Sequence, residues 1–327
     1  MLAGWYDRFG PADEVISIGE APEPTPGPGE VLVRLMASGI NPSDYKRRGN
    51  TKAPLEFPRV IPHSDGAGVV AAVGAGVDGF REGDRVWTFH AQWGRPNGTA
   101  AQYVALPAAL IQHLPQNVSF EQGACLGIPA MTGYRCAMGG GAVAGKTVYV
   151  PAAAGRVGAY AIQFAKLGGA RVIASASGQA KMDAARQLGA DIVFERNDPE
   201  LAGKVLNETG GRGVDRIVEI DLPGNILFNE SVLADGGSIA TYGSSPKPQV
   251  TLTLSPRRAR NFDLQIVFVY TLAPALAQTV CDGVIAAASG GRLIHRIAGI
   301  VPLAELARAH REAESQTGSG HMIVSIP

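Results

Sequence analysis

Apolar residues occur in short runs over roughly the first 120 positions of the chain and follow a different rhythm beyond them. The runs at 31–35, 68–73 and 86–89 are bounded by Gly, Pro and charged residues, which is typical of short strands. The Pro-rich segment 21–29 is incompatible with a helix or a central strand, so it predicts an extended loop that leads into a strand. This part of the chain is therefore expected to be rich in β-structure.

From Thr147 onward, strand-like runs alternate with helical apolar patterns. Strands are expected at 147–150, 171–174, 191–194, 216–219 and 237–242. Helices are expected at 158–167 and at 181–188, the second ending before Gly189. Such an alternation calls for a parallel sheet with helices on both of its faces.

The pattern changes once more near residue 265. An apolar run at 264–270 resembles a strand, and a terminal strand is expected at 322–326. Helical patterns occupy 274–288 and 303–313. No internal repeat is visible, and the length of 327 residues suggests about two domains.

Composition and charge exclude several classes of partner. The 29 basic residues balance the 29 acidic ones, which argues against general binding to nucleic acids or to anionic membranes. No stretch is long and apolar enough to span a bilayer, and the N-terminus lacks the features of a signal peptide. The three cysteines, an odd and sparse count, fit reduced thiols, so we expect a cytoplasmic protein.

The most informative motif is the segment 152–158, which reads AAAGRVG. It follows an expected strand and opens an expected helix, as a dinucleotide-binding turn does. Small residues let the backbone approach a pyrophosphate, and the helix N-terminus offers amide groups and partial positive charge. We expect cofactor contacts from Ala154, Gly155, Arg156, Val157 and Gly158. Alanine stands where the strictest pattern has its first glycine, and the alternative is a small-residue turn without a ligand.

The end of the second strand of this unit indicates which dinucleotide binds. An NAD site usually has an acidic residue there, whereas residues 174–181 contain no acid. Ser175 and Ser177 can donate to a 2′-phosphate, and Lys181 and Arg196 can supply positive charge. NADPH is therefore the expected cofactor, the alternative being that both cations are ordinary solvated surface charges.

At this point the chain resembles a known family. The resemblance rests on ASGINPSD at 37–44, on IPHSDGAGVV at 61–70 with the following GDRV at 83–86, and on the turn at 152–158. These blocks look like the medium-chain dehydrogenase/reductase superfamily and, within it, the zeta-crystallin-like quinone oxidoreductases. The resemblance extends in the family's order over nearly the whole chain.

The resemblance implies an α/β architecture of two domains. A GroES-like β-barrel catalytic domain is expected at 1–123, a Rossmann NADP-binding domain with a doubly wound parallel sheet at 124–265, and a segment returning to the catalytic domain at 266–327. The family also implies an active site in the cleft and a homodimer or homotetramer formed through the Rossmann domains.

The superfamily contains zinc and zinc-free branches, and the residues favour the second. The zinc enzymes carry a ligand cysteine in the segment that here spans 37–44 and contains none. By this alignment Ser64 stands at the second ligand position, His63 at the preceding glycine, and the third ligand falls near Ile128. The structural-zinc region, 89–103, has no cysteine. We expect no bound metal, and His63 to line the cleft or form hydrogen bonds.

The resemblance also implies roles for individual residues. Asn41 is placed to donate a hydrogen bond to the carbonyl of an acceptor, the alternative being that it shapes the turn before Pro42. The remaining expected residues are Tyr45, Ser64 and Asp65 lining the cleft, Thr132 near the nicotinamide, and the cofactor contacts Tyr242, Gly243, Ser244, Phe268, Val269 and Tyr270. Each of these can equally be a packing residue.

Without a Lewis acid, hydride transfer to an acceptor that is already electrophilic is the easier chemistry. We therefore expect a zinc-independent oxidoreductase that passes hydride from NADPH to a quinone. The alternatives are an NADPH-dependent alkene reductase acting on enones or enals, and a nucleotide-binding regulator with little catalysis. Several relatives carry a Tyr where this chain reads GNTK at 49–52, which counts against acyl-thioester reduction and leaves proton delivery to solvent or Tyr45.

Overall fold

The computed structural model describes the whole chain except residues 51–53, 244–247, 253–260 and 316–319. It contains two compact units, Met1–Pro129 with Cys281–Pro327, and Ala130–Val280. The domain boundaries expected after residues 123 and 265 lie earlier in the chain than the divisions between the units, which fall after Pro129 and after Val280. Residues 124–129 remain with the first unit because they pack on its sheet, and the chain beyond 265 first completes a strand of the second unit.

The first unit contains a large curved, mainly antiparallel sheet and a separate two-stranded sheet, which β1 and β2 form. Its strands are β1 (Leu2–Trp5), β2 (Ser17–Glu20), β3 (Glu30–Ile40), β4 (Asp65–Val73), β5 (Arg85–Thr88), β6 (Tyr103–Pro107), β7 (Ile111–His113), β14 (Ile297–Pro302) and β15 (His321–Ser325). Seven strands form one sheet in the order β14-β15-β3-β4-β5-β7, with β6 paired to β3. Strand β3 is central and largely buried because it has neighbours along both edges and packs on the core.

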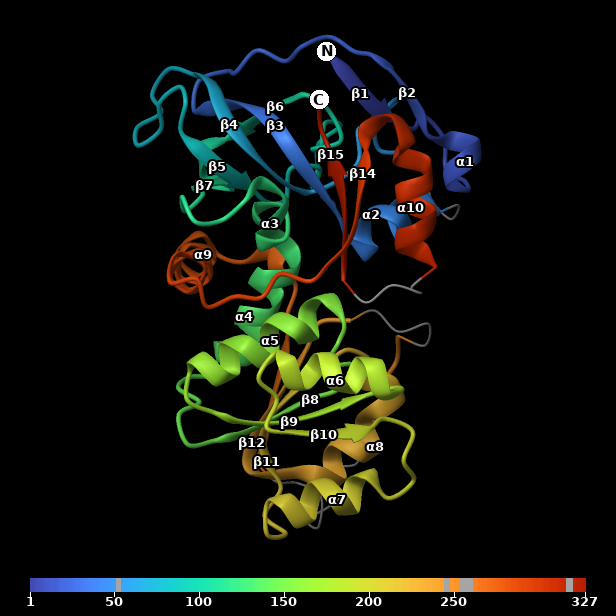
Figure 1. The fold of residues 1–327 in the computed structure, drawn as a ribbon, viewed down its shortest axis with the longest axis vertical. Coiled ribbons are helices and arrows are strands. Elements are labelled where there is room, and N and C mark those ends of the chain that lie inside the picture. Colours follow the sequence, from blue (N-terminus) through green and yellow to red (C-terminus); the bar gives the residue numbers. More distant parts are fainter. Residues whose placement is uncertain (51–53, 244–247, 253–260, 316–319) are drawn as a thin grey trace. The chain divides into compact units, whose positions relative to one another are not determined.

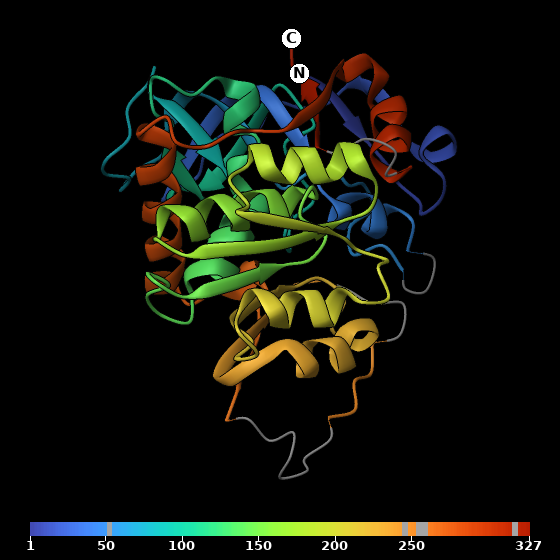
Figure 2. The same cartoon turned by 60° about the horizontal axis from the view of Figure 1, so that its bottom comes forward.

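Helices and turns of the first unit cover this sheet. They are α1 (Ala12–Val15), α2 (Pro42–Arg48), α3 (Phe120–Gly123), α10 (Leu306–Glu314) and the 3-10 turns η1 (Ala108–Leu110) and η4 (Leu303–Glu305). The two chain ends lie side by side (Figures 1 and 2). Gln102 joins them, since its side chain accepts from the Leu2 amide at 2.7 Å and donates to the Pro327 carbonyl at 3.2 Å.

The second unit is a six-stranded parallel sheet in the order β10-β9-β8-β11-β12-β13. Its strands are β8 (Thr147–Val150), β9 (Arg171–Ala176), β10 (Ile192–Glu195), β11 (Val214–Glu219), β12 (Leu233–Thr241) and β13 (Asp263–Ile266). Counted along the chain, this is the order 3-2-1-4-5-6 of a dinucleotide-binding fold, whose order reverses between β8 and β11. The expected α/β fold class is confirmed.

Helices cover both faces of the parallel sheet. They are α4 (Met131–Met138), α5 (Arg156–Leu167), α6 (Gln179–Gln187), α7 (Leu201–Glu208) and α8 (Leu222–Val232), with the 3-10 turn η3 (Val269–Thr271) near the end. Helices α5 and α6 lie on one face, and α7 and α8 on the other (Figure 1). The π-helical turn η2 (Leu126–Ala130) and α9 (Pro274–Ser289) cross the limits of the units.

Sequence patterns located most strands of the second unit, with differences at their ends. The expected strand at 264–270 is wrong beyond Ile266, because the chain leaves the sheet there and enters the turn η3. The expected strand at 237–242 begins earlier, since β12 starts at Leu233. Helices α4, α7 and α8 were not anticipated.

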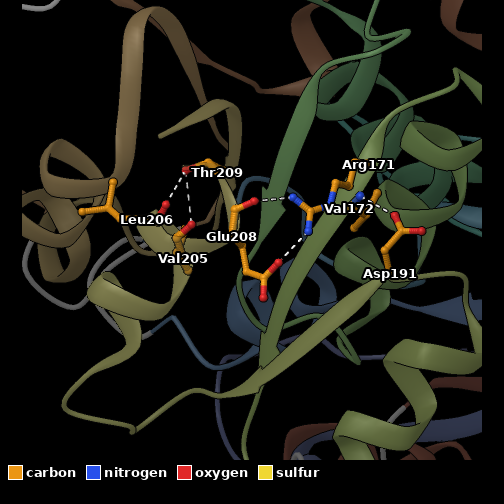
Figure 3. A network of polar contacts seen from close by, with 7 residues as sticks. All are labelled: Arg171, Val172, Asp191, Val205, Leu206, Glu208 and Thr209. Carbon is orange, nitrogen blue, oxygen red and sulfur yellow. Dashed lines mark hydrogen bonds and ion pairs between the residues drawn. The ribbon is translucent and has the colours of Figure 1, made fainter. Parts of the chain in front are cut away.

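Ionic contacts fix the amino-terminal edge of the parallel sheet (Figure 3). Arg171, which begins β9, donates to the Glu208 carboxylate near the end of α7 at 2.6 Å. Asp191, just before β10, accepts from the Val172 amide at 2.7 Å. Because both side chains of the Arg171–Glu208 ion pair are partly exposed, the pair contributes little stability by itself. It connects the end of α7 to the start of β9.

Candidate cofactor and active site

The small-residue turn lies between β8 and α5, at the point where the strand order reverses. The Ala152 carbonyl accepts from the Gly155 amide at 2.8 Å, and the Ala153 amide donates to the Ser175 carbonyl at 3.0 Å. Ala152 has φ 49°, a left-handed conformation that glycine adopts more readily. The first glycine of the strictest motif, counted back from Gly155 and Gly158, falls at Ala153. Ala152 precedes that position, and its left-handed conformation is tolerated at some cost in strain.

Gly158 allows α5 to begin against this turn. A Cβ atom at Gly158 would lie 2.7 Å from the Ala152 oxygen and 3.3 Å from the Ala153 Cα, both backbone atoms. Gly155 is the N-cap, and its lack of a side chain leaves the approach to the helix end open. The first turn of α5 carries no acidic residue, so its dipole favours an anion.

The expected cofactor residues of the second unit follow carboxyl ends of parallel strands. They are Ala154, Gly155, Arg156, Val157 and Gly158 after β8, Ser177 and Lys181 after β9, Arg196 after β10, Tyr242 and Gly243 after β12, and Phe268, Val269 and Tyr270 after β13. Because all pairings in this sheet are parallel, these segments meet at one edge. Ser244 lies outside the described residues.

Two of these positions are restricted by their surroundings. A Cβ atom at Gly243 would lie 1.6 Å from the Ile220 oxygen, so only glycine fits where the chain leaves β12. The Phe268 ring is half exposed and its centroid lies 5.1 Å from that of Tyr270, while Val269 is buried. Phe268 and Tyr270 therefore form an aromatic pair beside the end of the sheet.

Ser175 does not lie where a 2′-phosphate ligand is needed, and that expectation is corrected. Its side chain is fully buried, and its hydroxyl lies 2.7 Å from the Tyr149 hydroxyl inside the sheet. Burial raises the pKa of Tyr149 to about 12, so this contact is one between neutral hydroxyls. Ser177, two residues further on, is exposed at the end of the strand.

Residues 174–181 contain no acid, as expected, but the neighbouring strand brings one to the end of β9. Strand β10 pairs with β9 in a register that places Glu195 opposite Ala176, and the Gly178 amide donates to the Glu195 carboxylate at 2.8 Å. Sequence reasoning examined only the residues that follow β9 along the chain. The register of the neighbouring strand, which ends one residue before Arg196, was the signal that could have located Glu195.

Asn41 and Asp65 form the centre of the candidate acceptor site in the first unit. Asn41 caps α2, and its amide nitrogen donates to Asp65 Oδ2 at 2.7 Å. The same oxygen accepts from the backbone amide of Ile128 at 2.9 Å. Asp65 therefore determines the orientation of the Asn41 amide, since a flipped amide would place two oxygen atoms against each other.

Asp65 is completely buried, and burial raises its pKa well above the usual range. Its Oδ1 atom has no hydrogen-bond partner among the described residues. That oxygen occupies the space beside Gly127, where a Cβ atom would lie 2.1 Å from it. The roles of the Ile128 amide and of Gly127 beside Asp65 leave no signal in the sequence, because they come from backbone geometry.

The other expected residues of the two units are buried. Ser64 is 3 % exposed, and its carbonyl accepts from the Ala91 amide at 2.9 Å. Tyr45 lies on α2 and is 8 % exposed. Thr132 lies on α4 of the second unit and is 5 % exposed. Thr51 and Lys52, where a Tyr is missing, lie outside the described residues.

His63 belongs to a buried hydrogen-bond chain. The Thr99 hydroxyl donates to the backbone carbonyl of Asp65. The Ser38 hydroxyl, 2.7 Å from the Thr99 hydroxyl, must therefore donate to Thr99. Ser38 in turn accepts from His63 Nδ1 at 2.8 Å. His63 Nε2 then accepts from His310 Nε2 at 2.9 Å. Burial lowers the pKa of His63 to about 3 and that of His310 well below its usual value, so both rings are neutral.

The donor set around His63 does not suit a metal. Both His63 nitrogen atoms are engaged with Ser38 and His310. Within the described part of the chain, no group of three or more His, Cys, Asp or Glu side chains could hold a metal ion. The residues present therefore do not fit a zinc ion.

These features define a class of protein: a two-unit α/β dehydrogenase or reductase with a dinucleotide-binding parallel sheet. Comparison with known families agrees. Residues 27–116 match the alcohol dehydrogenase GroES-like domain, and residues 157–284 match the zinc-binding dehydrogenase family. A human quinone oxidoreductase is 30% identical over 93% of this chain and 91% of its own. The chain belongs to the quinone oxidoreductases of the medium-chain dehydrogenase/reductase superfamily and is an oxidoreductase.

Solved structures extend this similarity over the whole fold. A crystal structure described as an NAD-dependent alcohol dehydrogenase superposes with a TM-score of 0.87 at 29% identity, covering 100% of both chains. The mycobacterial protein Rv1454c, determined in complex with NADPH, has a TM-score of 0.85 at 26% identity and covers 99% of this chain and 100% of its own. None of the helices in the described residues has the length and apolar character that a membrane crossing requires.

Proposed function

We propose that this protein transfers hydride from NADPH to a quinone without the help of zinc. The observation that carries the proposal is the turn between β8 and α5, whose backbone is closely packed around Gly158 at the reversal of strand order. Quinone oxidoreductases about as long as this chain, with 30% identity, support the choice of acceptor. The donor set around His63, which does not suit zinc, supports the metal-independent chemistry.

The residues present fit a nicotinamide dinucleotide. Small residues and the N-terminus of α5 suit a pyrophosphate, and Arg156 begins that helix. Ser177, Lys181 and Arg196 would hold the adenosine end, and the exposed Phe268 ring gives an apolar surface at the same sheet edge. When bound, NADPH supplies the hydride. Related folds are described with NAD and with NADPH, and the two cations favour NADPH.

On the acceptor side, Asn41 is the residue we expect to act on the substrate. One amide hydrogen is used on Asp65. We assign the other, on a side chain that is 2 % exposed, to an acceptor carbonyl, where it would stabilise negative charge that develops on the oxygen. Asp65 and the Ile128 amide hold Asn41 in this orientation. We assign the final proton to solvent or to the Tyr45 hydroxyl, and Thr132 to the cofactor site.

An exposed edge of the parallel sheet supports a proposal for the oligomeric state. Strand β13 is an edge strand on which Ile266 is 78 % exposed and Leu264 is 37 % exposed. An apolar edge of this kind favours pairing with a second copy, so we propose a homodimer or a homotetramer through the second unit. Light scattering should show a dimer or larger that dissociates in an Ile266→Lys variant; a monomeric wild type would refute this.

The three cysteines of this chain are buried thiols, as cysteines commonly are in proteins of a reducing compartment. We therefore propose a cytoplasmic location. Expression of a tagged copy followed by cell fractionation tests this, and recovery in a secreted fraction would contradict it.

The function is tested by following oxidation of NADPH with a panel of quinones, enones and enals. Asn41→Ala should lower kcat/KM for a quinone by roughly 10- to 100-fold, because a donor to the developing oxyanion is lost, and should leave NADPH binding unchanged. Asn207→Ala, on the exposed face of α7, is the matched control and should retain full activity. Turnover of enones alone would reassign the acceptor, and tight NADPH binding with no turnover would favour a regulator.

A further inference from the structure

Glu195 lies at the place where the cofactor's adenosine ribose is recognised in this fold. It ends β10, opposite Ala176, the last residue of β9. The Gly178 amide donates to Glu195 Oε2 at 2.8 Å, and Gly178 begins α6 with φ 81°. The carboxylate is therefore held against the turn between β9 and α6, where a ribose 2′ substituent is bound in dinucleotide folds.

Cations and this acid act in opposite directions at that turn. Lys181 is exposed on the first turns of α6, and Arg196 follows Glu195, its amide donating to the Ala176 carbonyl at 3.1 Å. Both guanidinium and ammonium groups attract a 2′-phosphate, whereas a carboxylate repels it and accepts a hydrogen bond from a free 2′-hydroxyl. The Gly178 amide, already engaged with Glu195, is not available to a phosphate oxygen in this arrangement.

We propose that Glu195 is a specificity-determining residue that lowers the preference of this protein for NADPH, so that NADH is a second usable cofactor. This inference rests on the proposed function, because it concerns the adenosine end of the same cofactor site. It differs from a purely structural role, in which Glu195 would only hold the β9–α6 turn through the Gly178 amide.

Glu195→Gln separates these two roles. The amide side chain removes the charge but retains one oxygen that accepts from the Gly178 amide at the turn; only the longer contact of Oε1 with the Asn197 amide, at 3.5 Å, is lost. Binding of NADPH, NADH, adenosine 2′,5′-bisphosphate and AMP is measured by titration on the full-length protein. Removing one charge near a phosphate should raise the NADPH-to-NADH affinity ratio roughly tenfold, with the same change in the ratio of the bisphosphate to AMP. Glu200→Gln, an exposed position five residues later, is the control for net charge.

An increase of this size in Glu195→Gln, with little change in Glu200→Gln, supports the inference. An unchanged ratio in a Glu195→Gln variant that still binds both cofactors would overturn it and leave the proposed function standing. An equal increase in both variants would also overturn it, because net charge alone would then be the cause. Failure of the wild type to bind either cofactor would overturn the proposed function together with this inference.

Discussion

Replacing Gly158 by alanine tests whether close packing at the start of α5 creates the cofactor site. The added Cβ atom would lie 2.7 Å from the Ala152 oxygen, whereas carbon–oxygen contacts are ordinarily about 3.3 Å or longer. Because the atoms it meets belong to the backbone, the turn or the helix must move by roughly half an ångström. Overpacking of this kind costs about 1–3 kcal/mol, and the better helix propensity of alanine returns less than about 1 kcal/mol.

The net loss should lower the melting temperature of the second unit by a few degrees, since about 1 kcal/mol corresponds to roughly 2–4 °C for a domain of this size. NADPH affinity should fall by about tenfold or more, because the displaced amides no longer converge on the pyrophosphate. Calorimetry and fluorescence titration measure the two effects. Gly203→Ala, within α7, is the control, because its added Cβ atom would meet no neighbouring atom within 4 Å. This variant should be slightly more stable than the wild type, with unchanged NADPH affinity.

A Gly158→Ala protein that melts and binds NADPH like the wild type would refute the role given to this turn. A loss of stability without a loss of affinity would show that the pyrophosphate does not bind at this helix. Equal losses in Gly203→Ala would show that glycine replacement in general, and not the close contact, is the cause.

Three further predictions concern the first unit. The free energy of unfolding should be independent of His63 and His310 above about pH 6.5. Below that pH it should fall toward pH 3 by about 1.4 kcal/mol per pH unit for each of them, because only the unfolded chain takes up their protons. Urea midpoints that do not change between about pH 7.5 and 5.5 would contradict this. Asp65→Ala should destabilise the unit by about 2–4 kcal/mol, since two buried donors lose their acceptor, which thermal melting at neutral pH measures against the wild type. Glu314→Ala should cost about 2 kcal/mol by removing the ion-pair partner of the buried Arg48, and an unchanged melting temperature would show that Arg48 is satisfied by other groups.

The sequence predicts the architecture of this protein well because its patterns are local. The run 147–150 and the helical pattern after it correspond to β8 and α5, and together they locate the phosphate turn. The end of β13 was missed because apolar residues continue past Ile266 into a turn, and a short apolar run does not show where pairing stops.

The side-chain environment of the candidate site depends on contacts between neighbouring strands, which a single sequence does not record. Ser175 and Ser177 are equivalent by residue type, but Ser175 lies within β9, whose residues from Val172 to Ala176 are buried, whereas Ser177 lies just beyond the end of the strand and is exposed. Glu195 is 17 residues from Gly178 along the chain, and only the register of β10 against β9 brings the two together. A one-residue shift of that register would turn the carboxylate to the other face.

The segment 63–65 illustrates why a motif alone could not decide between a metal site and a metal-free one. His63, with φ 78°, directs its ring toward His310, which lies 247 residues away on α10, while Asp65 lies on β4 and fixes the Asn41 amide. The side chains of His63 and Asp65 are thereby committed to partners that the spacing of the motif does not reveal. Because Asn41 depends on Asp65 for its orientation, Asp65→Ala should lower kcat/KM for a quinone even under conditions in which the variant remains folded. Unchanged quinone turnover by folded Asp65→Ala would mean that Asn41 does not act on the acceptor through the amide that Asp65 orients.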